Sequence, residues 1–192
     1  MELKEVELRF GVQFPNLFHE IYLSGMMEYL IHPNECPFQQ EQFFGNYMDD
    51  CILIAFENLP DAYADLQECF DLDLTLYPQH KSMNPNYRII PFARKISGDK
   101  YCFLYTAGET EPKIILYGHD TGDVDLWADN FEELIYFQLV AEASSGEQSL
   151  DSDYMKAHIK WLNEEHQQLL AALPAQTLWE QLPEPEEFDI WI

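Results

Sequence analysis

Apolar residues recur at helical spacing in four stretches of the chain. A helix is predicted near residues 15–24, where one face collects Phe14, Leu17, Phe18, Ile21 and Tyr22. An amphipathic helix is predicted near residues 60–70, with acidic residues on its exposed face. The capping signal Asp129-x-x-Glu132 predicts a third helix near residues 129–142. From Tyr154 one long helix is predicted, with an apolar stripe that stops at Pro174 and comprises Met155, Ile159, Leu162, Leu169 and Leu173.

Strand patterns lie between the predicted helices. The continuous apolar run Cys51–Phe56 is short enough to form a buried strand. Tyr101–Thr106 and Lys113–Tyr117 are rich in aromatic and β-branched residues and are bounded by Gly, Pro, Asp and Glu. Further on, Val124 and Leu126 alternate with Asp125 and Trp127. Residues 88–140 are therefore expected to form three strands joined by turns, followed by a helix.

The remaining segments have weaker patterns. Residues 1–10 fit either a short helix or an edge strand, and the alternation does not decide between them. Residues 26–45 lack periodicity, which predicts an irregular insertion, and the small, polar residues 144–153 are typical of a linker. The tail at 177–192 mixes acids and prolines with aromatic residues, so we expect it to pack on the body or on a partner.

Four motifs follow one another in the middle of the chain: Ile89-Ile90-Pro91, Gly98-Asp99 before Tyr101-Cys102-Phe103, Tyr117–Asp120, and Ala128–Leu134. Their order resembles the SUKH superfamily, in the branch named for the yeast cell-wall regulator Smi/Knr. The segment from Phe14-Pro15 to Ser24-Gly25 is similar to the opening helix of that family, with Ser24 in place of Asn. The resemblance covers roughly residues 6–140.

The patterns and the resemblance together predict an α+β fold, in which helices cover a twisted, mainly antiparallel sheet. At 192 residues the chain is long enough for one domain with additions. We expect a SUKH-like domain at residues 1–143. Residues 144–192 are expected to add one helix and an acidic, aromatic tail that packs on this domain.

The chain is strongly acidic, with 35 Asp and Glu against 10 Lys and Arg and a formal net charge of -25. Such a field repels phosphate backbones and anionic lipid, which argues against nucleic acid or membrane as a partner, and it attracts cationic proteins. An acidic protein that is simply soluble explains the charge equally well. Four widely spaced cysteines favour reduced thiols, and residues 1–24 contain no apolar leader, so we expect a cytoplasmic protein.

The sequence offers no motif for catalysis. H-E-x-x-H, G-x-S-x-G, the P-loop and G-x-G-x-x-G are all missing, so no catalytic residue, metal ligand or cofactor is assigned. The run His119–Asp125 holds three carboxylates, but it departs from the order of a calcium loop, and a tight turn is the simpler interpretation. An enzyme that uses His119 and Asp120 stays a third hypothesis.

Carboxylates at the predicted hairpin ends and on the helix near 60–70 form the candidate partner-binding site: Asp61, Asp65, Glu109, Glu111, Asp120, Asp123 and Asp125. If they line one side of the sheet, they make an acidic patch that complements a basic ligand. A solvated polar face is the alternative.

The resemblance implies a binding module and not an enzyme. Many bacterial members of the SUKH superfamily are immunity proteins, which neutralise nuclease or other domains of polymorphic or contact-dependent toxins. We therefore hypothesise that the partner is a basic toxin domain. The resemblance to fungal members supports a different hypothesis, a regulatory scaffold whose tail around Trp179 and Trp191 recruits a signalling partner.

Overall fold

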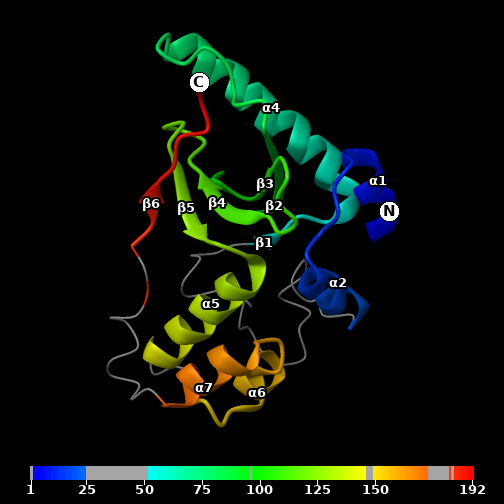
Figure 1. Cartoon of the computed structure of the whole chain (residues 1–192), viewed down its shortest axis with the longest axis vertical. Coiled ribbons are helices and arrows are strands. Elements are labelled where there is room, and N and C mark those ends of the chain that lie inside the picture. Colours follow the sequence, from blue (N-terminus) through cyan, green and yellow to red (C-terminus); the bar gives the residue numbers. More distant parts are fainter. Residues whose placement is uncertain (1, 25–51, 96, 146–148, 173–181, 183) are drawn as a thin grey trace.

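The described residues form a central antiparallel sheet of six strands in the order β1-β2-β3-β4-β5-β6 (Figure 1). The computed structural model describes residues 2–24, 52–95, 97–145, 149–172, 182 and 184–192. Its strands are β1 (Ile52–Leu53), β2 (Tyr87–Arg94), β3 (Lys100–Thr106), β4 (Lys113–Tyr117), β5 (Val124–Ala128) and β6 (Glu186–Glu187). Each strand pairs with the next along the chain, so the sheet is a meander.

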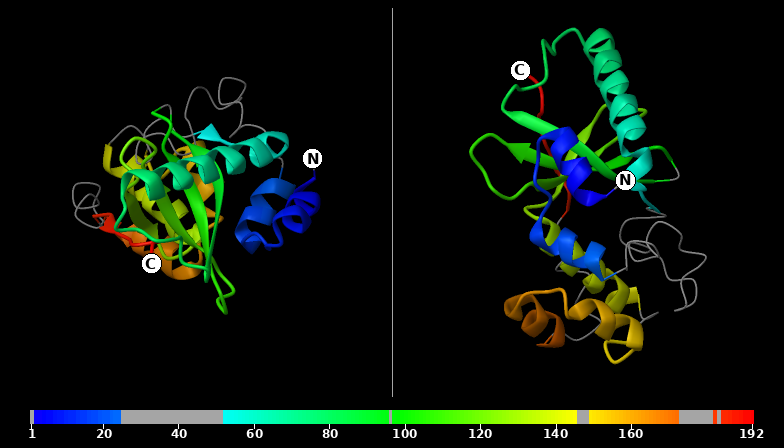
Figure 2. Two further views of the ribbon diagram at one scale, coloured as in Figure 1. Left: turned by 90° about the horizontal axis from the view of Figure 1, so that it is seen from above. Right: turned by 90° about the vertical axis from the view of Figure 1, so that its right-hand side faces the viewer.

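Helices cover both faces of the sheet, which confirms the predicted α+β class (Figures 1 and 2). One face packs against α4, and the other packs against α1, α2 and α5. The helices are α1 (Leu3–Phe10), α2 (Asn16–Leu23), the 3-10 turn η2 (Phe56–Asn58), α4 (Leu59–Leu76), α5 (Phe131–Ser145), α6 (Asp153–Ile159) and α7 (Glu164–Ala172). The first ten residues thus contain a helix and not an edge strand.

Strand β3 shows why the central strands are apolar on both sides. Tyr101 and Phe103 point into the core shared with α2 and α5, while Cys102 and Leu104 point into the core beneath α4. All four are buried, as expected for a strand covered on both faces. On the first side, Phe18 of α2 places its ring 5.4 Å from the ring of Phe103 and 5.3 Å from that of Phe131, edge to face in both cases.

Two predicted boundaries shift for local reasons. Of the described part of the predicted strand 51–56, residues 52–56, only Ile52–Leu53 forms a strand, and the chain turns into η2 from Phe56. At the start of α5 the cap is Asn130, whose Oδ1 accepts a 2.9 Å hydrogen bond from the backbone N–H of Glu133. The cap therefore lies one residue after the predicted Asp129. The insertion predicted at 26–45 lies outside the described residues.

In the described part of the C-terminal extension there are two helices, α6 and α7, where one long helix was predicted. Asn163 interrupts the helical run: its backbone N–H and its side chain both donate to the carboxylate of Glu132 on α5, at 3.0 and 2.9 Å. Its Oδ1 then caps α7 by accepting from the N–H of His166. Because the sheet lies on one side of α5 and α6 on another, every residue from 134 to 143 is buried.

The end of the chain returns to the sheet. Strand β6 pairs with β5, and the N–H of Phe188 donates to the carbonyl of Val124 at 2.7 Å. Ile190 is fully buried in the core beneath α4, and the ring of Trp191 lies 5.7 Å from that of Phe70. In Figure 1 this segment runs beside β5 and ends near α4. Trp179 lies outside the described residues.

Candidate functional site

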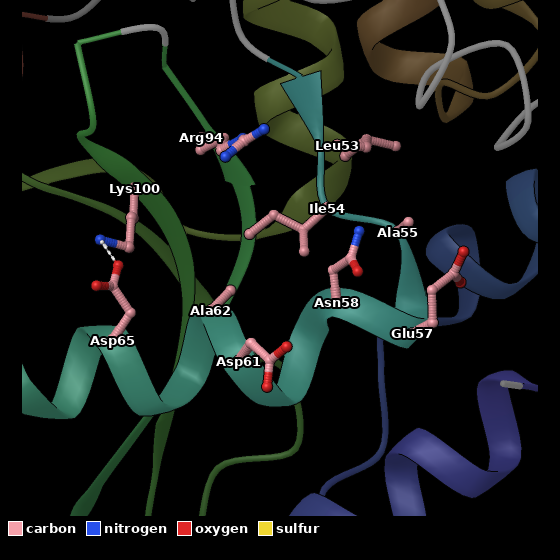
Figure 3. Close-up of a pocket in the computed structure, with 10 residues that line it drawn as sticks. All are labelled: Leu53, Ile54, Ala55, Glu57, Asn58, Asp61, Ala62, Asp65, Arg94 and Lys100. Carbon is pink, nitrogen blue, oxygen red and sulfur yellow. Dashed lines mark ion pairs between the residues drawn. The ribbon is translucent and has the colours of Figure 1, made fainter.

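A groove of about 520 Å³ lies between α4 and the sheet edge formed by β1, β2 and β3 (Figure 3). The first turns of α4, with η2 before them, form one wall, and the facing strands form the other. Leu53, Ile54 and Ala62 supply apolar surface between the walls. Charged residues stand on both walls, and their signs differ.

The α4 wall is acidic. It presents Glu57, Asp61 and Asp65, all three exposed. Asp61 and Asp65 are four residues apart, so the helix places them one above the other on the same face. The exposed face of the amphipathic helix predicted near 60–70 therefore becomes a carboxylate wall.

The strand wall is basic. Arg94 of β2 is paired directly with Lys100 of β3, which puts both side chains on the α4 face of the sheet. Like charges in this position repel each other. Lys100 is only 7% exposed, and its Nζ lies 2.8 Å from Oδ2 of Asp65. Asp65 thus neutralises Lys100, while Arg94 lines the same groove without an ion-pair partner among the described residues.

A second cavity of about 420 Å³ shares Asp65, Arg94 and Lys100 with the first and extends to His119. The imidazole of His119 lies between two carboxylates, with Nδ1 3.2 Å from Asp99 and Nε2 3.1 Å from Asp120. Gly98 permits this packing: it has a φ of 105°, and a Cβ there would lie 2.8 Å from the imidazole. The β2–β3 and β4–β5 turns are therefore joined through His119.

Asp99 is the acceptor at the centre of this junction. Its carboxylate accepts from the hydroxyl of Ser97 at 2.9 Å and from the backbone N–H of His119 at 3.2 Å. Burial alone would raise the pKa of Asp99. The hydrogen bonds from Ser97 and His119 outweigh that effect, so the pKa of Asp99 lies below its ordinary value.

Beyond the turn, β5 and β6 form a second group of carboxylates. Asp125 pairs directly with Glu187 across the two strands, and Asp123 precedes it on the same chain segment. The pKa of Asp125 is raised, first by burial and then by the charges of Asp123 and Glu187. Within the described ranges, no three His, Cys, Asp or Glu side chains are arranged to hold a metal ion.

The match to known families falls on the part of the chain that builds these features. The model of the SMI1 / KNR4 family (SUKH-1) matches residues 1–136. The chain belongs to this family. Its predicted membership of the SUKH superfamily is thereby confirmed. No curated protein and no solved structure matches the chain.

The SUKH match contains the whole groove and ends within α5. Helices α6 and α7 and strand β6 follow it, so Glu187 is an addition of this chain to the matched region. Within the described ranges, none of the helices combines the length and the apolar character needed to cross a membrane.

The structure separates the predicted site residues into three groups. Asp61 and Asp65 form the acidic wall, and Asp120 lies beside His119 at the same end of the sheet. Asp123 and Asp125 lie towards β6. Glu109 and Glu111 belong to the β3–β4 turn, which is at the opposite end of the strands. Glu109 and Glu111 therefore lie apart from the other predicted site residues and do not share one continuous acidic patch with them.

Three relevant residues escaped the sequence reasoning. Glu187 was missed because its position beside Asp125 depends on the pairing of distant segments. Arg94 and Lys100 were missed because the search followed the dominant negative charge. A signal was present, since three of the ten Lys and Arg residues fall between positions 94 and 100.

Proposed function

We propose that this SUKH protein is a non-enzymatic immunity protein, which neutralises a basic toxin domain by binding it. Two facts support the proposal: the family, whose bacterial members are commonly immunity proteins, and a formal net charge of -25. The observation that carries it is the carboxylate group Asp123, Asp125 and Glu187, in which burial first and the repulsion from Asp123 and Glu187 second raise the pKa of Asp125. A cationic partner that docks there relieves this repulsion.

Neutralisation requires no reaction in this proposal. A nuclease domain holds its phosphate substrate in a cationic groove, and an acidic protein seated on that groove excludes the substrate. The long-range field speeds the encounter, while the carboxylates in direct contact set the lifetime of the complex. A toxin domain of this kind acts on nucleic acid inside the cell, so we place the protein in the cytoplasm.

The test begins with the reading frame next to this gene, which should encode a large protein with a toxic C-terminal domain. We expect that domain and this protein to form a complex when mixed. The complex should weaken strongly between about 0.05 and about 0.5 M NaCl, since salt screens charges in contact with solvent. The activity of the toxic domain should be lost in the complex.

Two double variants locate the contact. Asp123→Asn with Asp125→Asn removes two charges near β6, whereas Glu109→Gln with Glu111→Gln removes two charges at the opposite end of the strands. We expect the first pair to weaken the complex about tenfold or more and the second to leave it nearly unchanged. Equal effects would show that net charge acts without a binding face, and absence of any complex would refute the proposal.

A further inference from the structure

The groove beside α4 contains a cation that the proposed function does not use. Of the three basic residues around the β2–β3 turn, Lys100 is bound to Asp65. Lys95 places its ammonium 5.8 Å from the ring centre of Tyr101 and 5.9 Å from that of Trp127. Arg94 is exposed, and its guanidinium has no ion-pair or hydrogen-bond partner among the described residues. The N–H groups of Arg94 are therefore available to a ligand in the groove.

The acidic wall does not satisfy Arg94. Asp61 lines the same groove, and in the described part of the chain it too has no ion-pair partner. Figure 3 shows Arg94 on the strand wall and Asp61 on the helix wall, on opposite sides of the space between them. The groove therefore offers a ligand two opposite charges. The carboxylate of Asp61 accepts hydrogen bonds on one side, and the planar guanidinium of Arg94, with five N–H donors, lies on the other.

The cost of this arrangement supports a role in binding. Arg94 stands directly opposite Lys100, a like-charge pair that destabilises a sheet, and one carboxylate, Asp65, offsets only one of the two cations. An apolar or acidic residue at position 94 would remove the repulsion. A partner that brings a carboxylate to Arg94 removes it as well.

We propose that the groove receives a segment of the partner protein that carries both signs, with an acidic side chain on Arg94 and a basic one on Asp61. The inference deepens the proposed function, on which it rests, by naming what the basic partner presents here. A segment with basic residues alone would place a cation against Arg94 and Lys100 and be repelled. The groove therefore discriminates among basic proteins, while the remaining acids attract them all.

The acidic wall also argues for this class of ligand. A nucleic acid or a free phosphate would bring negative charge to Glu57, Asp61 and Asp65 as well as to Arg94. A peptide segment with Glu and Lys about four residues apart matches both walls, because one turn of helix presents the two side chains on one face. The fork of Arg94 suits a carboxylate, which it binds through two parallel hydrogen bonds.

The test uses two labelled, alanine-based peptides of roughly 15 residues, one with Lys as its charged residue and one with Glu and Lys four positions apart. Binding to the full chain is followed by fluorescence anisotropy at low salt. Arg94→Gln is compared with Lys113→Gln, which removes the same charge near the opposite end of the strands. Circular dichroism verifies that both variants fold, and Arg94→Lys keeps the charge without the fork.

We expect Arg94→Gln to weaken the mixed-charge peptide about tenfold, the effect of one strong charge-assisted contact, and Arg94→Lys to weaken it less. Binding of the Lys peptide should be unchanged or stronger in Arg94→Gln, since a repelling charge is gone. If Arg94→Gln and Lys113→Gln behave alike, or if both peptides respond in the same direction, the inference is overturned. The assay contains no toxin domain, so its outcome is independent of the complex test.

Discussion

The phenol of Tyr117 on β4 donates a 2.6 Å hydrogen bond to the carboxylate of Asp73 on α4, 44 residues earlier in the chain. Both residues are buried, and the pKa of Tyr117 is raised by burial first and by Asp73 second. Gly122 of the next turn packs on the same carboxylate, where a Cβ would come within 2.8 Å of Oδ1. This contact fixes the β4–β5 turn against α4, and with it the position of Asp120 relative to the acidic wall.

We predict that Tyr117→Phe lowers the free energy of unfolding by about 1–3 kcal/mol, because a buried carboxylate loses its donor. Urea unfolding followed by circular dichroism measures the change. The control is Tyr77→Phe, which removes an exposed 3.1 Å bond to the carbonyl of Thr121, so a loss below about 1 kcal/mol is expected. Equal losses for the two variants would mean that Asp73 gains another donor or water when Tyr117 is changed.

The lowered pKa of Asp99 predicts a stability effect that depends on pH. A carboxylate with a folded-state pKa below its ordinary value of 3.8 stabilises the fold above that value, and the contribution disappears as pH falls through the folded-state pKa. Asp99→Asn should therefore destabilise the protein more at about pH 5 than at about pH 2.5, because the contribution of the charge shrinks as pH falls towards and through the folded-state pKa. Thermal unfolding at both pH values measures this. A destabilisation of equal size at both pH values would point to packing and not to charge.

The raised pKa of Asp125 predicts the opposite sign. Ionised Asp125 is disfavoured in the folded state by burial and by Asp123 and Glu187, so its charge lowers stability at neutral pH. Asp125→Asn should raise the melting temperature at about pH 7, and the gain should vanish below about pH 3.8, where the unfolded chain also binds the proton. Asp120→Asn is the comparison, because Asp120 faces His119 and its loss should not stabilise. A drop in melting temperature for Asp125→Asn would contradict the assigned repulsion.

Local periodicity explains which elements could be predicted. The apolar face of α2 and the aromatic strands β3 and β4 each depend on residues that are close together in the sequence, so helix and strand spacing located them. The break between α6 and α7 was missed because it depends on Glu132, more than thirty residues before Asn163 in the chain. The apolar stripe that begins at Met155 continues across Asn163 in the sequence, so the apolar spacing gave no sign of the break.

The candidate site depends still more on distant pairing. Arg94 faces Lys100 because β2 has an irregularity between Pro91 and Ala93, which shifts the register of the residues after it. Nothing in the spacing of positions 94 and 100 reveals that register. Likewise, Asp125 and Glu187 approach each other only because β6 joins the sheet. Charge counts locate acidic segments, and strand pairing decides which charges meet.

The last prediction concerns the segment after the family match. Ile190 is fully buried between α4 and the sheet, although it lies far outside residues 1–136. Ile190→Ala should cost about 2–5 kcal/mol, the range for truncating a core side chain. Ile192→Ala serves as control because that side chain is 57% exposed, and a change within about 0.5 kcal/mol is expected.

The burial of Ile190 also bears on the hypothesis that the tail recruits a signalling partner. If residues 186–192 complete the core, removing them lowers stability, and lost partner binding in a truncated chain is then explained by unfolding. A truncated chain that unfolds at the same urea concentration as the full chain would contradict this and restore the tail as a free recruiting segment. Because Phe188, Ile190 and Trp191 all pack on the sheet core beneath α4, we expect the truncated chain to unfold earlier.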